Sequence, residues 1–174
     1  MTNTTPVIVR LLLNQFAMSL FGIMLTFSTI MVSDAFGAAA SFVAIFLYFY
    51  LTYNVMWDKG ARDVISPDHD KKGSPAKGFL YSFLAMIPTV VLTVIFSVIT
   101  VEMTNYSAFA NSLYAFAKMV LMFAFQGMYH GFANLFGYHF VFYIICLFPA
   151  VIIGGTSYMM GYKNIRIIPQ KQDK

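Results

Sequence analysis

The run FLYSFLAMIPTVVLTVIFSVITV, from Phe79 to Val101, contains no charged side chain. A helix needs about 20 apolar residues to cross the hydrocarbon core of a bilayer. This run is therefore long enough to span a membrane, and Pro88 inside it is compatible with a membrane helix. Three further apolar runs of similar length are Val7 to Val32, Phe36 to Trp57 and Phe140 to Tyr162.

The composition of the whole chain also indicates a membrane protein. Of its 174 residues, 59% are apolar and 10% are charged, whereas soluble domains carry about 25% charged residues. A soluble protein of this length has too much surface for its volume to hide so many apolar side chains. The excess must face lipid, so we expect a single all-α integral membrane domain over residues 1–174.

The basic residues gather in two short stretches, which predicts the orientation of the chain. Nine of the eleven Lys and Arg residues lie within 59–77 and 163–174. Basic clusters beside apolar spans mark the cytoplasmic side of a cell membrane, and this pattern differs from a nucleic-acid-binding surface. We expect the loop 58–78, the tail 163–174 and both termini in the cytoplasm, in an inner or plasma membrane.

A fifth candidate segment, Ser112 to Phe132, is constrained by these two basic stretches. The loop 58–78 and the tail 163–174 lie on the same side of the membrane only if an even number of crossings separates them. The segment also contains Lys118, and a charge at membrane depth is costly. We expect four full crossings plus this segment as an interfacial or re-entrant helix on the outer face. The alternative is five full crossings, with Lys118 pointing into the helix bundle.

Small and hydroxyl-bearing residues recur at spacings of three and four along each span. In lipid, such residues let helices approach closely and form hydrogen bonds between them. We expect them to pack the bundle of one chain; the alternative is that Gln15, Thr26, Thr89 and Thr93 line a polar path or an oligomer interface. The stripes comprise Gln15, Ser19, Gly22, Thr26, Thr29 and Ser33; Gly37, Ala40, Ser41 and Ala44; Ser82, Ala85, Thr89, Thr93, Ser97 and Thr100; and Ala150, Gly154, Ser157 and Gly161.

Four polar residues are candidates for a coupling role in the membrane. Lys118 needs a partner or water if it lies at membrane depth, and Glu102 and Asp34 lie toward the same outer side in the expected topology. Snorkelling of Lys118 to the outer interface is the alternative. Gln15, on the stripe of the first span, is the fourth candidate.

The element Trp57-Asp58-Lys59-Gly60-Ala61-Arg62-Asp63 follows the second span. Tryptophan is typical of the membrane interface. If the helix continues, Asp58 faces Arg62 and Lys59 faces Asp63 at a spacing of four residues. The element is then a helix end held at the headgroups. The alternative is a docking site for a cytoplasmic partner, formed by Trp57, Asp58, Arg62 and Asp63.

No pattern in the sequence indicates an enzyme, a metal or a cofactor. The motifs HExxH, GxSxG, Walker A and GxGxxG are absent. His130 and His139 lie nine residues apart in an aromatic stretch, but no cysteine or carboxylate completes a metal or haem site with them. We expect a non-enzymatic protein.

Three short motifs carry a resemblance to a group of small membrane proteins. They are Trp57-x-x-Gly60-x-x-Asp63, the pair Lys77-Gly78 that opens the span with Pro88, and Gly161-Tyr162-Lys163-Asn164. With them the chain resembles uncharacterised small polytopic proteins of the bacterial inner membrane, which have basic inner loops and a similar end. The resemblance implies this architecture and a bacterial inner membrane, and it transfers no activity and no functional residue.

The functional expectation is a small transport or channel-type module that acts as a homo-oligomer. The polar stripes, Lys118 and the prolines Pro88 and Pro149 favour it, because polar groups and helix breaks at membrane depth accompany solute pathways. The second hypothesis is an accessory or scaffold subunit of a larger membrane complex, with residues 57–63 as its contact. The third, an intramembrane enzyme, lacks a convergent set of titratable residues.

Overall fold

The computed structural model describes residues 5–65, 74, 76–102, 108–136 and 140–167, and every regular element in them is helical. Four helical stretches of this part of the chain are long and apolar enough to cross a membrane: Pro6–Thr29, Asp34–Ile65, Lys77–Ile95 and Val141–Tyr162. The protein is an all-α membrane bundle, which confirms the fold class expected from the sequence.

The four spans are formed by α1 (Thr5–Ile30), α2 (Asp34–Ile65), α3 (Lys77–Glu102) and the successive helices α6 (Phe140–Ile145) and α7 (Leu147–Tyr162). Between α3 and α6 lie α4 (Ala108–Val120), a π-helical turn (Leu121–Gln126), a 3-10 turn (Gly127–Tyr129) and α5 (His130–Leu135). The last span is interrupted at Cys146, because Pro149 in the first turn of α7 has no N–H to donate to the Ile145 carbonyl.

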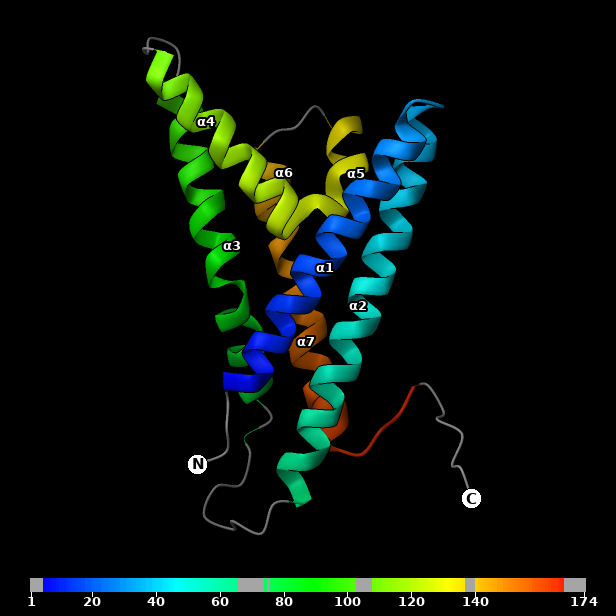
Figure 1. The fold of residues 1–174 in the computed structure, drawn as a ribbon. Helices are drawn as coiled ribbons and strands as arrows, with labels where there is room; N and C mark the ends of the chain where they lie inside the picture. The colour runs from blue at the N-terminus through cyan, green and yellow to red at the C-terminus, as the bar shows by residue number, and fades with distance from the viewer. Residues whose placement is uncertain (1–4, 66–73, 75, 103–107, 137–139, 168–174) are drawn as a thin grey trace.

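The helices end in two groups at opposite ends of the bundle (Figure 1). At one end, Gly60 near the end of α2 and Gly78 at the start of α3 both contact Tyr158 of α7. We call this the basic end, because Lys59, Arg62, Lys77 and Lys163 lie there. At the other end, which we call the hairpin end, the short connection through Ser33 joins α1 to α2.

Helix α2 is longer than the sequence analysis expected, since it continues to Ile65 through residues assigned to the loop 58–78. Two ion pairs along this extension, Lys59–Asp63 at 2.7 Å and Arg62–Asp58 at 2.8 Å, favour the helical conformation. Its 32 residues correspond to about 48 Å at ~1.5 Å per residue. This length exceeds the roughly 30 Å of the hydrocarbon core, so α2 is longer than a perpendicular crossing requires.

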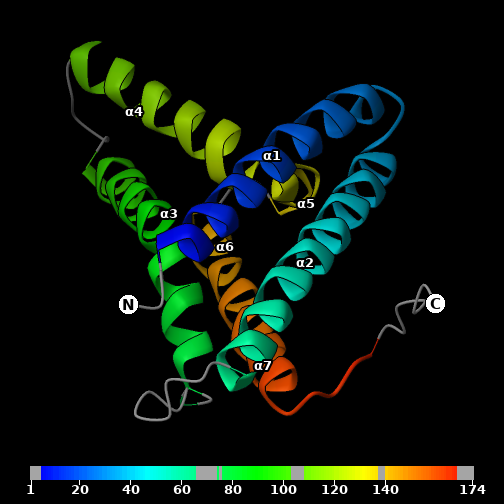
Figure 2. The same cartoon turned by 60° about the horizontal axis from the view of Figure 1, so that its bottom comes forward.

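The segment between α3 and α6 enters the bundle and returns to the same end. Figure 2 shows α4 crossing from the end of α3 toward α1, while α5 lies against α1 and α2. The backbone of residues 122–127 contacts Gln15 and Ser19 in the middle of α1. Further along, Asn134 reaches Asp34 at the hairpin end. We therefore call residues 108–135 the re-entrant segment.

Most described residues of the small-residue stripes lie in the interior of the bundle, as the sequence predicts, whereas Thr29 is half-buried and Ser33 is exposed. A side chain at Gly161 would collide with the Trp57 carbonyl, and one at Gly60 with the Tyr158 carbonyl, so α2 and α7 approach closely at these two positions. Phenylalanines such as Phe46, Phe83 and Phe148 lie on the exposed outer surface instead. Buried stripe residues are Gln15, Ser19, Gly22, Thr26, Gly37, Ala40, Ser41, Ala44, Ser82, Ala85, Thr89, Thr93, Ala150, Gly154, Ser157 and Gly161.

Candidate functional site

The tip of the re-entrant segment is a break in helical structure at the centre of the bundle. The regular helix α4 gives way to the π-helical turn 121–126 and then to the 3-10 turn 127–129. Non-helical backbone at membrane depth is tolerated only where protein buries it or where it lines a cavity. Single π-helical turns are also frequent at functional sites.

The hydroxyl of Ser19 on α1 holds this tip. It accepts a 2.6 Å hydrogen bond from the backbone N–H of Gly127 and donates a 2.9 Å bond to the carbonyl of Met122. A side chain at Gly127 would collide with the Ser19 carbonyl and with Ile23, so this approach requires glycine. Ser19, on the polar stripe of α1, thus forms hydrogen bonds with two backbone groups at the interruption of the helix.

The returning arm is bonded to the α1–α2 hairpin. The N–H of Gly131 donates to the Ser41 hydroxyl at 2.8 Å, and a side chain at Gly131 would collide with the Gly37 carbonyl. Near the hairpin end, the Asn134 amide donates to the Asp34 carboxylate at 2.8 Å. These contacts fix the depth at which the tip stands in the bundle.

Two buried glutamines flank the tip, and each is only 2% exposed. The Nε2 of Gln15 donates to the Thr89 hydroxyl at 2.8 Å and to the Phe125 carbonyl at 3.2 Å. The Nε2 of Gln126 donates to the Tyr143 carbonyl at 3.2 Å and contacts the Thr93 hydroxyl at 3.5 Å. The Thr93 hydroxyl in turn donates to the Thr89 carbonyl. We call Gln15, Thr89, Thr93, Gln126 and Tyr129 the polar cluster.

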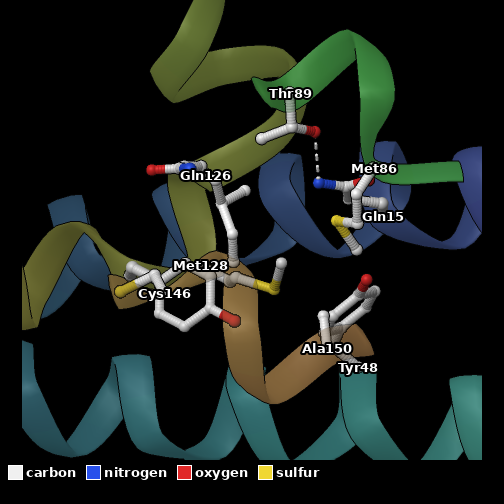
Figure 3. Close-up of a pocket in the computed structure, with 10 residues that line it drawn as sticks. Gln15, Tyr48, Met86, Thr89, Gln126, Met128, Cys146 and Ala150 are labelled. Atoms are coloured by element: carbon white, nitrogen blue, oxygen red, sulfur yellow. Dashed lines mark hydrogen bonds between the residues drawn. The ribbon is translucent and has the colours of Figure 1, made fainter. Parts of the chain in front are cut away.

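A small cavity lies beside the polar cluster (Figure 3). The space that it leaves for the centre of a water-sized sphere is about 10 Å³, close to the minimum that holds one water molecule. It is lined by Gln15, Tyr48, Met86, Thr89, Gln126, Met128, Tyr129, Cys146, Leu147 and Ala150. These residues come from all four spans and from the re-entrant tip, so every part of the bundle contributes to one central site.

Three buried oxygen atoms of the residues lining this cavity have no hydrogen-bond partner among the described residues. They are Oε1 of Gln15, Oε1 of Gln126 and the hydroxyl oxygen of Tyr129. Burying such a group without a partner costs about 1–3 kcal/mol. The three atoms are neutral, and two of them are amide oxygens that can only accept hydrogen bonds.

The lining determines what chemistry the cavity allows. Among the described residues that line it, none is Asp, Glu, Lys, Arg or His. Within the described part of the chain, no three His, Cys, Asp or Glu residues come together as a metal site. The unpartnered oxygen atoms of Gln15, Gln126 and Tyr129 can instead accept hydrogen bonds from a species about the size of a water molecule, or coordinate it.

The candidate coupling residues lie in three different places. Gln15 belongs to the polar cluster. Asp34 is exposed at the hairpin end, where it accepts the bond from Asn134. Lys118 is half-buried on α4, close enough to His130 for their charges to interact. Glu102 is the last residue of α3, and its side chain lies outside the described residues, as does its predicted pairing with Lys118.

The candidate partner-contact residues lie at the basic end, and two of them contact α7 (Leu147–Tyr162) or the residues that follow it in the same chain. The Trp57 indole donates a 2.7 Å hydrogen bond to the Ile165 carbonyl, and the Arg166 guanidinium lies 4.1 Å from the indole centre. The Tyr158 hydroxyl donates to the Asp63 carboxylate at 2.8 Å. The side chains of Asp58 and Arg62 remain outward, 47% and 71% exposed.

The motif with Trp57, Gly60 and Asp63 therefore contacts the motif that begins at Gly161. Residues at spacings of three lie on one face of α2, and here that face meets the end of α7. The chain then leaves α7 through Asn164, whose φ of 55° is a left-handed conformation that often ends helices. These two motifs form one helix–helix contact.

The sequence alone does not mark Gln126 or Tyr129 as site residues, and it does not predict the bond between Ser19 and Gly127. The available signal was the polar pair Gln126-Gly127 followed by Gly131 within an apolar segment, which marks a break in a membrane helix. Comparisons of the chain with protein-family models, with curated proteins and with solved structures find no match.

Proposed function

We propose that the protein is a small, non-enzymatic transport module whose solute site is the polar cluster. The observation that carries the proposal is that Gln15, Gln126 and Tyr129 line the central cavity and each has a buried oxygen atom with no partner among the described residues. A solute that donates hydrogen bonds to them offsets the cost of burying them. The break in the re-entrant segment beside the same cavity supports this role, since a cavity is one of the two places in which irregular backbone is tolerated inside a membrane.

The proposed solute is a hydrogen-bond donor or monovalent cation about the size of one water molecule. The cavity volume of about 10 Å³ sets this size. Neutral amide and hydroxyl oxygens suit water, ammonium or an alkali cation, whereas Ca²⁺ and Mg²⁺ sites are built with carboxylates. The described lining residues carry only neutral polar groups, which favours the neutral and monovalent solutes.

Movement of the solute requires the cavity to open, and its lining provides flexible side chains. Met86 and Met128 both contribute to the cavity wall, and methionine has three rotatable bonds and adapts its shape readily. Both residues are buried at 5% and 1% exposure, so the site is closed in this conformation. A closed site suits a transporter that exposes its solute alternately to the two sides.

The proposal places the protein in a bacterial inner membrane as a homo-oligomer, with the basic end in the cytoplasm. The positive-inside rule supports this orientation. Gln15, Thr89 and Gln126 are buried within a single chain, so each protomer has its own complete polar cluster. The site consequently does not depend on an interface between copies.

The scaffold hypothesis has less support at the basic end. Trp57 and Asp63 are engaged by α7 and the residues that follow it, so a partner docking on this element would contact mainly Asp58 and Arg62. We therefore rank an accessory or scaffold role second.

The proposal is tested by flux into liposomes that contain the purified protein. Water is followed by light scattering, ammonium by an internal pH dye and alkali cations by a diffusion potential. The decisive variant is Thr89→Val, which removes the acceptor of the Gln15 bond at nearly constant volume. Flux of the transported solute is expected to fall about tenfold, the effect of losing one hydrogen bond of about 1.4 kcal/mol.

The matched control is Thr156→Val, the same substitution at an exposed position of α7 whose hydroxyl bonds only within its own helix. It is expected to leave flux unchanged. The proposal fails if none of the three solutes crosses faster than in protein-free liposomes, or if the two valine variants reduce flux equally.

A further inference from the structure

A groove at the basic end lies outside both the polar cluster and the contact between α2 and α7. It is formed by the first turns of α1 and the last turns of α2, and its volume is about 170 Å³. The lining residues are Pro6, Val7, Arg10, Val55, Asp58, Lys59 and Arg62. It is thus a basic groove with apolar residues in its walls.

The groove carries more positive than negative charge. Three cations and one carboxylate line it. Asp58 is bonded to Arg62 by two contacts, of 2.8 Å to Nη2 and 3.1 Å to Nε. Lys59 is paired with Asp63 at 2.7 Å. Arg10 is exposed and has no ion-pair partner among the described residues, so its charge is available to a ligand.

Arg62 and Lys59, although ion-paired, still have N–H groups that can donate hydrogen bonds to a ligand. A guanidinium has five N–H donors and an ammonium has three. The contacts with Asp58 and Asp63 use only part of this capacity in Arg62 and Lys59. Arginine suits phosphate in particular, because its planar donors match two phosphate oxygens at once.

The groove stands at the level of the membrane surface. Helix α2 is longer than the hydrocarbon core is thick, and the charged residues that begin at Asp58 favour an end of the helix outside the core. Trp57, immediately before them, is typical of the interface. Arg10 lines the same groove from α1 and therefore stands at the same level. Phosphate groups of lipids occupy this level of a bilayer.

We propose that this groove binds a phosphate-bearing anion, with Arg10 as the principal ligand and Arg62 and Lys59 as further donors. Two sources supply this chemistry: the headgroup of an anionic phospholipid and free phosphate in solution. The apolar walls at Val7 and Val55 suit a lipid, whose glycerol and first acyl carbons need an apolar surface. This inference is independent of the proposed transport function.

The test is native mass spectrometry of the full chain in detergent, titrated separately with phosphatidylglycerol, phosphatidylcholine and inorganic phosphate. The variant is Arg10→Gln. Because Arg10 is exposed and unpaired, this change removes no described ion pair of the fold. The control, Lys163→Gln, removes one positive charge from an exposed position of the basic end outside the groove.

The expected result is retention of phosphatidylglycerol over phosphatidylcholine, with affinity lowered about tenfold by Arg10→Gln and changed less than about twofold by Lys163→Gln. If phosphatidylglycerol binds and inorganic phosphate does not displace it, the source is a lipid headgroup. If inorganic phosphate binds alone with the same dependence on Arg10, the source is soluble phosphate.

Two results overturn the inference. Equal affinity for phosphatidylglycerol and phosphatidylcholine, with no binding of inorganic phosphate, excludes recognition of a net anionic ligand, because the phosphatidylcholine phosphate is neutralised by its own trimethylammonium group. Equal loss of affinity in Arg10→Gln and Lys163→Gln shows a diffuse attraction to the basic end, without a site in the groove. Arg62→Gln provides a second variant in the groove if Arg10→Gln does not yield folded protein.

Discussion

The backbone N–H of Gly127 donates a 2.6 Å hydrogen bond to the hydroxyl of Ser19, residues that are 108 positions apart in the chain. This bond joins the tip of the re-entrant segment to the middle of α1. The same hydroxyl bonds the Met122 carbonyl, so one small side chain satisfies two backbone groups that a broken helix leaves without partners. Ser19 therefore contributes two of the hydrogen bonds that hold the tip in place.

Replacing Ser19 by alanine is expected to destabilise the protein by about 2 kcal/mol, because a buried N–H and a carbonyl lose their partner. Thermal unfolding in detergent measures this as a lower midpoint. Ser28→Ala is the control on the same helix, since Ser28 is exposed and bonds only to the Met24 carbonyl. Equal shifts for the two alanine variants would show that the bond to Gly127 contributes nothing.

The hydrogen bond between Tyr158 and Asp63 is expected to stabilise the contact of α7 with α2. Tyr158→Phe leaves the Asp63 carboxylate with its ion pair to Lys59 but without the tyrosine donor. We expect a loss of about 1 kcal/mol in unfolding free energy. In a double-mutant cycle with Asp63→Asn, the coupling energy should exceed about 0.5 kcal/mol.

Tyr162→Phe is the control for this cycle, because Tyr162 lies one turn further along α7 and its hydroxyl has no hydrogen bond to a described residue. It should change stability by less than about 0.5 kcal/mol. A coupling energy near zero between positions 63 and 158 would contradict the role assigned to the bond.

The spans could be predicted from the sequence because lipid imposes a simple rule on them. A lipid-facing helix must be apolar along about 20 residues, and small residues must gather on the face that meets other helices. Thr26 and Thr89 are fully buried for this reason. The sequence left open whether the second helix continues past Trp57 into residues 58–78, because charged residues suit both a loop and a helix end. In the structure α2 continues to Ile65, and two ion pairs along the helix favour this conformation.

The polar cluster could be predicted only in part. Gln15 stood out because a glutamine in a membrane span needs a partner. Its neighbour Phe125 and the second glutamine, Gln126, reach it only because the re-entrant segment stops at a particular depth. That depth is set by bonds such as Gly131 to Ser41, between residues 90 positions apart. Local sequence patterns contain no information on such pairings.

Tyr129→Phe separates the stability of the polar cluster from its proposed function. The Tyr129 hydroxyl is buried and has no protein partner among the described residues, so its removal is expected to change the unfolding free energy by less than about 0.5 kcal/mol or to increase it. If the hydroxyl contacts a transported solute, flux into liposomes should nevertheless fall. A large loss of stability with unchanged flux would assign this hydroxyl to the fold alone.

Labelling of single cysteines is expected to distinguish four crossings from five. Ser74 and Lys163 are exposed beyond the ends of α2 and α7, and Ser33 is exposed at the hairpin end. In a background with Cys146 replaced by serine, a membrane-impermeant maleimide should label Ser33→Cys in intact cells. It should reach Ser74→Cys and Lys163→Cys only after the cells are permeabilised, since the basic end is proposed to face the cytoplasm. With five crossings, positions 74 and 163 would be labelled from opposite sides, because a complete crossing by the re-entrant segment would move the end of α7 across the bilayer.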